Sequence, residues 1–216
     1  MDKNKLISTI KELKEKSSKR NFKQTFDLIV NLKELDMKKP EHQVDFFATL
    51  QHPRKKIKVC AFVGPELLED ARNSCDLAIS QDEFEKYAKD KKLAKKLARE
   101  YDLFIAQANI MAPVATAFGR VLGPKGKMPN PKAGCVVPPK TSLRPLYEKL
   151  QKTIRISAKK DPIIQIAIGK EDGNEDEITD NVLTIYDQLI HHLINEKNNI
   201  KNVLLKLTMS KPIKLE

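Results

Sequence analysis

The chain has 216 residues, of which 40 are Lys or Arg and 29 are Asp or Glu, so its formal net charge is +11. This length allows one domain or two small ones, and the positive charge favours polyanionic partners such as nucleic acid. Three widely spaced cysteines, Cys60, Cys75 and Cys135, exclude a disulfide framework or a zinc site and indicate a reducing compartment.

The first fifty residues predict a helix followed by two strands. Leu6, Ile10 and Leu13 share one face of a helix, and this charged segment lacks the unbroken apolar run of a secretory signal. Apolar and polar residues then alternate over residues 25–33 and 44–50, as in half-buried strands. We expect these two strands to be antiparallel partners in an α+β unit. Because no run is long enough to span a bilayer, we expect a cytoplasmic protein without a membrane partner.

The character of the chain changes after a basic, proline-containing linker at residues 51–56. The apolar run that follows, residues 57–63, predicts a strand covered on both faces. Strand and helix patterns alternate from there to residue 150, and this alternation predicts a doubly wound, Rossmann-like α/β domain. Its further elements are expected at residues 66–72 (helix), 77–79 (strand), 83–100 (helices), 103–106 (strand), 111–121 (helix) and 143–150 (helix).

The last third of the chain returns to the α+β style of the first fifty residues. Strands are expected at residues 153–158, 163–168 and 203–208, and a helix at residues 178–194. Neither chain end has enough strands to form a core alone, so we expect the two ends to fold together. The predicted architecture is therefore of the α/β class. Residues 1–54 and 151–216 form one discontinuous α+β domain, and residues 55–150 form the inserted Rossmann-like α/β domain.

The excess charge belongs mostly to the middle of the chain, where residues 53–150 carry 19 basic residues against 11 acidic ones. Much of it lies in the predicted helix KDKKLAKKLARE at residues 89–100. A run of this kind is usually a solvated helix face. The alternatives are a surface that binds phosphates and one that docks an acidic protein partner.

The sequence carries no recognisable catalytic or metal-binding constellation. Its four histidines do not share a ligand spacing, and neither a nucleophile elbow nor a Walker loop is present. The turn Val63-Gly64-Pro65-Glu66 has one glycine where a dinucleotide site needs three. We therefore predict a protein that is not an enzyme and that has no metal and no cofactor.

The least ordinary segment is the loop at residues 122–134, where Gly and Pro define the backbone path. Lys125, Lys127 and Lys132 stand along it without an acidic residue between them. One interpretation is a rigid structural loop, and another is a set of auxiliary RNA or interdomain contacts. A phosphate-ester enzyme with these lysines as an anion clamp is the rival from the enzyme class, but the chain lacks the acid, base and metal ligands that it needs.

Three segments, GRVLGPKGKMPNPKAG, RNFKQTFDLIVNLKELDMKKPEHQ and KLTMS, together resemble the L-one family of large-subunit ribosomal proteins of archaea and bacteria. The resemblance covers nearly the whole chain and implies the same two-domain architecture. It also implies that the discontinuous domain carries the main rRNA-binding surface. Carried over by position, the RNA-binding residues are Phe22, Thr25, Asp27, Gln165, Asn202, Thr208, Met209 and Ser210.

Two positions depart from the family pattern. Ser210 stands where the family has a glycine, which puts close backbone approach to RNA in question, and Asp27 is shorter than the usual Glu. The resemblance implies a structural constituent of the large ribosomal subunit, a monomer when free, that binds the stalk of the large-subunit rRNA. It further implies a role in releasing deacylated tRNA from the exit site and in repressing translation of its own operon by binding its mRNA.

Overall fold

The computed structural model describes residues 2–18 and 20–215, so the predicted domain limits at residues 1 and 216 lie outside it. The chain divides into two compact units. Unit 1 contains the residues up to Lys55 and those from Lys152 onward, and unit 2 contains Lys56–Gln151. Helices combine with antiparallel sheets in unit 1 and with a parallel sheet in unit 2, which confirms the predicted α/β class.

The main sheet of unit 1 has the strand order β10-β9-β1-β8. Every pair of neighbours is antiparallel. In β1 every second side chain is buried, as the alternation of apolar residues in the sequence predicts. The strands are β1 (Thr25–Leu32), β8 (Ile163–Lys170), β9 (Ile200–Leu207) and β10 (Ile213–Lys214).

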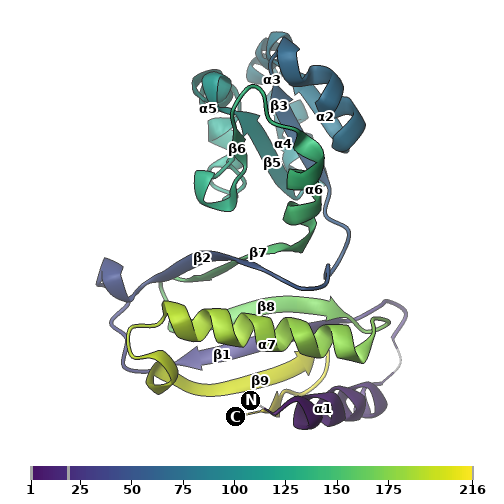
Figure 1. Ribbon diagram of the computed structural model, residues 1–216, viewed down its shortest axis with the longest axis vertical. Helices are drawn as coiled ribbons and strands as arrows, with labels where there is room; N and C mark the ends of the chain where they lie inside the picture. The colour runs from purple at the N-terminus through teal and green to yellow at the C-terminus, as the bar shows by residue number, and fades with distance from the viewer. Residues whose placement is uncertain (1, 19, 216) are drawn as a thin grey trace. The chain divides into compact units, whose positions relative to one another are not determined.

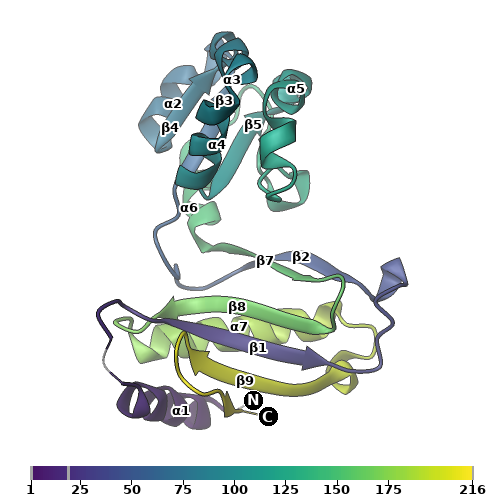
Figure 2. The ribbon, with the colours of Figure 1, turned by 180° about the vertical axis from the view of Figure 1, so that it is seen from behind.

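Helix α7 (Glu175–His192) covers one face of this sheet, and α1 (Lys3–Lys16) packs against α7 (Figure 1). Each helix begins at a side-chain cap: Asp2 accepts a hydrogen bond from the Asn4 N–H, and Asn174 accepts one from the Asp176 N–H. Among the described residues of unit 1, no helix covers the opposite face of β9, β1 and β8 (Figure 2). No helix in the described residues is long and apolar enough to cross a membrane.

The second strand of the chain does not pair as expected. β2 (Val44–Thr49) pairs with β7 (Thr153–Ala158) in a separate two-stranded antiparallel sheet, so its predicted pairing with β1 is wrong. The reason is that β8 and β9 occupy both edges of β1. On this ribbon Arg155 donates two hydrogen bonds to the Asp45 carboxylate, at 2.8 and 2.9 Å.

Unit 2 contains a parallel sheet with the strand order β4-β3-β5-β6. β3 (Val59–Val63) is buried along its whole length, as expected for a strand with helices on both sides. The other strands are β4 (Leu77–Ser80), β5 (Leu103–Gln107) and the two-residue β6 (Val136–Val137), which the sequence analysis did not predict.

Helices cover both faces of this sheet (Figures 1 and 2). α3 (Phe84–Lys89), α4 (Lys91–Glu100) and α5 (Met111–Leu122) form one apolar cluster with the sheet. α2 (Leu68–Ser74) and α6 (Leu143–Lys152) lie together, since Asp70 accepts a hydrogen bond from the Leu143 N–H at 2.7 Å. This arrangement is the doubly wound one.

Candidate nucleic-acid interface

The sequence-predicted contact residues of the chain ends meet at one edge of the unit 1 sheet. β1 and β9 are antiparallel, and Phe26 is the register partner of Leu207. The loop that precedes β1 therefore lies next to the turn that follows β9. This pairing brings Phe22 and Thr25 together with the residues from Thr208 to Ser210.

Direct hydrogen bonds hold the two segments together. The Thr25 N–H donates to the Thr208 hydroxyl at 3.0 Å, and that hydroxyl lies 3.3 Å from the Thr25 carbonyl oxygen. The Thr208 side chain therefore joins the start of β1 to the turn after β9. We call this pair of contacts the Thr25–Thr208 closure. Phe22 is 51% exposed and Met209 is 60% exposed, so two large apolar side chains face solvent beside this closure.

Gln24 is a buried residue of the site that sequence reasoning missed. Its side-chain carbonyl accepts a hydrogen bond from the Met209 N–H at 3.1 Å, and its amide donates to the Ser17 hydroxyl at 2.7 Å. One side chain thus links the end of α1, the start of β1 and the turn after β9. The alternation of the strand could have indicated its burial, because Gln24 stands two positions before Phe26 and four before Leu28, whose side chains face the core.

Ser210 holds the turn after β9 by its own hydroxyl, which accepts from the Leu207 N–H at 2.8 Å, while the Ser210 N–H donates to the Leu207 carbonyl at 3.1 Å. Among the described residues, the non-glycine positions with positive φ are Glu34 and Glu196. The backbone of Ser210 therefore does not need glycine for its conformation. The turn after β9 therefore forms with a serine at position 210, where the family pattern has a glycine.

Asp27, Gln165 and Asn202 lie farther along the open face of the sheet. In the register, Asp27 sits between Ala167 and Lys206, and Gln165 pairs with Ile29. Burial raises the pKa of the Asp27 carboxyl, and the nearby ammonium of Lys206 partly offsets this.

Asn202 accepts a hydrogen bond from the Asn31 amide at 2.6 Å. It precedes Thr208 by six positions, about 20 Å at the rise of a strand. The predicted residues therefore form a compact group at the sheet edge and an extension along the open face.

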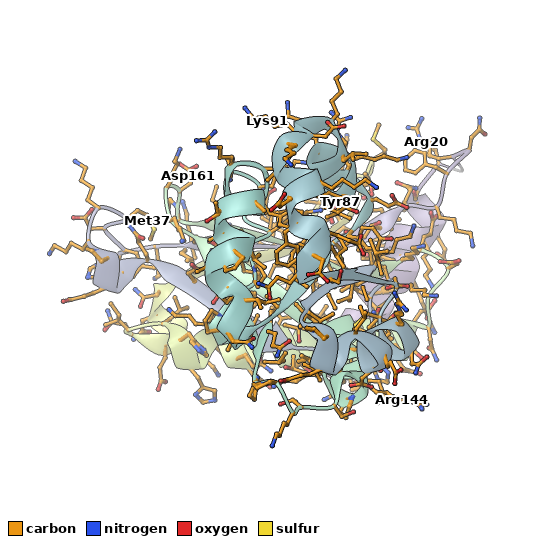
Figure 3. All side chains as sticks on the ribbon, turned by 90° about the horizontal axis from the view of Figure 1, so that it is seen from above. Arg20, Met37, Tyr87, Lys91, Arg144 and Asp161 are labelled. Atoms are coloured by element: carbon orange, nitrogen blue, oxygen red, sulfur yellow. The ribbon has the colours of Figure 1, made fainter. Side chains whose placement is uncertain are left out.

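A hollow of about 440 Å³ opens beside Met209, between α1 and the turn after β9. Its walls include the apolar side chains of Leu13 and Ile213 and the cationic side chains of Lys16 and Lys211. Arg20, in the loop between α1 and β1, is exposed and extends outward from the ribbon (Figure 3). Exposed apolar groups and cations are thus combined at this edge, with Glu12 as the acid among the hollow's lining residues.

The three predicted auxiliary lysines belong to unit 2 and differ from one another. Lys127 donates hydrogen bonds to the carbonyl oxygens of Ala98 and Tyr101, at 3.1 and 2.7 Å. It therefore satisfies backbone acceptors at the C-terminus of α4, which is a structural role. Lys125 and Lys132 are exposed.

The described residues offer little that resembles a catalytic centre. No group of three or more His, Cys, Asp or Glu among them is arranged to hold a metal ion. Burial raises the pKa of the Cys75 thiol to about 12 and that of Cys135 to about 11, which suppresses the reactive thiolate. The buried Gln107 side chain accepts the Gly64 N–H at 2.8 Å, so the backbone donor after β3 is already occupied.

Comparison with known proteins gives one consistent result. The family model of the Ribosomal protein L1p/L10e family matches residues 13–211. Large ribosomal subunit protein uL1 of Methanobrevibacter smithii is 39% identical over 206 residues, which cover 94% of this chain and 95% of the relative. The uL1 protein of Thermococcus kodakarensis is 38% identical over 217 residues, covering 100% and 98%. Because the family model and the full-length relatives agree, the chain belongs to the Ribosomal protein L1p/L10e family.

Proposed function

We propose that this chain is a structural protein of the cytoplasmic large ribosomal subunit and that it binds the stalk region of the large-subunit rRNA. Its relatives are named large ribosomal subunit proteins, and a ribosomal protein of this family is not an enzyme. The observation that carries the RNA-binding proposal is the sheet-edge group, in which exposed Phe22 and Met209 flank the Thr25–Thr208 closure. No cofactor or metal is needed for this function.

The chemistry of the group suits RNA. Single-stranded and irregular RNA is bound through unstacked bases on aromatic and apolar side chains, and through hydrogen bonds to 2′-hydroxyls and phosphates. Phe22 and Met209 supply the apolar surface, and Asp27, Gln165 and Asn202 supply acceptors and amides along the sheet. Gln24 and Thr208 hold the two chain segments in place, so little ordering is needed when RNA binds.

Purified full-length protein titrated with a stalk rRNA fragment, and with an unrelated RNA duplex of equal length, tests the proposal at several salt concentrations. We expect tighter binding to the stalk fragment at every salt concentration. Phe22→Ala should weaken stalk binding, whereas Ile194→Ala, at a site that is 56% exposed and lies outside the sheet-edge group, should not. Equal affinity for both RNAs, or equal effects of the two substitutions, would remove the proposed site.

Two further roles are proposed for the same surface: assistance to deacylated tRNA leaving the exit site, and repression of the chain's own operon through its mRNA. Both partners are RNAs, and the free protein is proposed to meet its mRNA as a monomer. Adding purified protein to translation of the operon mRNA in vitro should lower its yield, and stalk rRNA fragment should restore it. For the tRNA role, ribosomes that contain the Phe22→Ala protein should retain deacylated tRNA longer than ribosomes that contain the Ile194→Ala protein.

A further inference from the structure

Helix α4 presents a row of cations to solvent on unit 2. Its exposed polar face consists of Lys91, Lys92, Lys95, Lys96 and Arg99, while Ala94, Leu97 and Ala98 are buried. Lys91 is labelled at the start of this helix in Figure 3. Within the described part of the chain, none of these five cations forms an ion pair with an acidic side chain. The row is therefore a concentrated positive charge without an internal counterion.

Three acids close to this row in sequence have other partners. Asp90 caps the first turn of α4 by accepting the Lys92 N–H at 2.8 Å, and Glu85 pairs with Lys89. Glu100 lies 4.0 Å from Lys58 at the far end of the helix. Lys127 adds its ammonium at the C-terminus of α4.

The neighbouring helix α5 has open space at one position, Gly119. α4 and α5 pack against each other in the same apolar cluster. Gly119 stands inside α5, where glycine weakens a helix relative to alanine, yet a Cβ built there meets nothing within 4 Å. Gly123, one turn later, has a packing reason, since its Cβ would lie 2.6 Å from the Gly119 carbonyl oxygen. The fold therefore requires Gly123 but not Gly119.

From these features we propose that the α4–α5 face of unit 2 is a second RNA-binding surface, which takes the sugar-phosphate backbone of an RNA duplex. In this proposal the α4 cations contact phosphates. Because Gly119 has no side chain, the sugar-phosphate backbone of the RNA can approach α5 closely. Residues 91–125 carry seven Lys and Arg against two acids, which gives the surface the charge that a polyanion complements. This inference does not rest on the sheet-edge site of unit 1.

An acidic protein is the less suitable occupant because protein interfaces are anchored by buried aromatic or aliphatic side chains. The exposed large apolar residues of the described chain, Phe22, Ile163, Ile194 and Met209, all belong to unit 1. The α4–α5 face offers charge and small side chains, which suit a phosphate backbone.

A charge-neutralising variant and a matched control test the cationic row. The variant is Lys92→Gln, Lys95→Gln and Lys96→Gln in the full-length protein, and the control is Arg72→Gln, Lys140→Gln and Arg144→Gln on the α2–α6 side. The probe is a short mixed-sequence RNA duplex without stalk sequence, titrated at several salt concentrations. The α4 variant should bind about tenfold more weakly at low salt, and its log-log salt slope should fall by up to about 0.9 per lost phosphate contact. The control should change both quantities much less.

Substitution of Gly119 tests close approach separately from charge. Because the position is open, Gly119→Leu and Gly119→Ala should both fold, with thermal unfolding temperatures at or above that of the wild type. Gly119→Leu should nevertheless weaken duplex binding severalfold, while Gly119→Ala should weaken it less. This opposition between stability and binding is not expected of a residue with a merely structural role.

Three results would overturn the proposal. The first is equal loss of duplex affinity in the α4 variant and the α2–α6 control. The second is unchanged duplex affinity in a folded Gly119→Leu protein. The third is competition by polyglutamate as effective as that by RNA at equal charge concentration, which would identify an acidic protein surface as the occupant. Stalk-specific affinity should persist in the α4 variant, so failure here is distinguishable from failure of the sheet-edge site.

Discussion

Replacing Met209 with alanine separates contact with RNA from packing within the protein. Met209 is 60% exposed, while Leu207, two positions earlier, is fully buried. Complete burial of a methionine side chain contributes about 1.5–3 kcal/mol, so covering the exposed part with RNA would contribute about 1–2 kcal/mol. Since each 1.4 kcal/mol is tenfold in affinity, Met209→Ala should weaken stalk rRNA binding about 5- to 30-fold. The free energy of unfolding should change by less than about 0.5 kcal/mol.

Denaturant unfolding and RNA titration on the same preparation measure both quantities. Met209→Leu is the matched variant, because it keeps a side chain of similar volume and should retain most of the affinity. A Met209→Ala protein that lost about 2–5 kcal/mol of stability and still bound stalk RNA like the wild type would refute the reasoning. Such a result would also weaken the assignment of Phe22 and Thr208.

Replacing residues 57–150 by a short Gly/Ser linker should preserve most stalk-specific binding, and loss of that binding in a folded product would move the specificity to unit 2. Lys127→Ala should destabilise unit 2 by about 1.5–3 kcal/mol in thermal or denaturant unfolding, because charged hydrogen bonds to two carbonyls are lost, whereas Lys125→Ala should leave its stability nearly unchanged. The Arg155 guanidinium beside Asp45 holds the pKa of that carboxyl at about 2, below its ordinary 3.8. The pair therefore stabilises the fold above pH 4, its contribution is lost as pH falls from about 4 to 2, and Asp45→Asn should flatten this part of the acid unfolding curve.

Local pattern predicted most elements of this fold, because strands and helices repeat at different periods. The alternation in β1 is matched by its buried and half-buried side chains. Boundaries shifted where a cap decides them: α7 begins at Glu175 because Asn174 caps it, rather than at Ile178. Which strands pair with each other was harder to predict from local pattern. The pairing of β2 with β7, for example, joins residues about a hundred positions apart.

The candidate site shows the same division between local and long-range information. The family resemblance pointed to Thr208 and Met209 but not to Gln24. The role of Gln24 depends on its hydrogen bond with the Met209 N–H, 185 positions away in the chain. The basic loop of unit 2 looked uniform in sequence, yet Lys127 is engaged with α4 while Lys125 is exposed. A lysine's partner depends on which carbonyls the fold leaves open, and no local pattern carries that information.

The two segments that form the sheet-edge group lie far apart in the sequence, and this separation limits the order in which the two units can fold during synthesis. Thr25 and Thr208 are 183 positions apart, so the loop-closure entropy for their contact is large, and β9 must be synthesised before β1 gains it as a neighbour. Unit 2 is continuous in sequence, and its parallel sheet can assemble while the last strands are still inside the ribosome. During synthesis unit 2 can therefore fold before unit 1, and the sheet-edge group can form only after β9 and the turn that follows it have been synthesised.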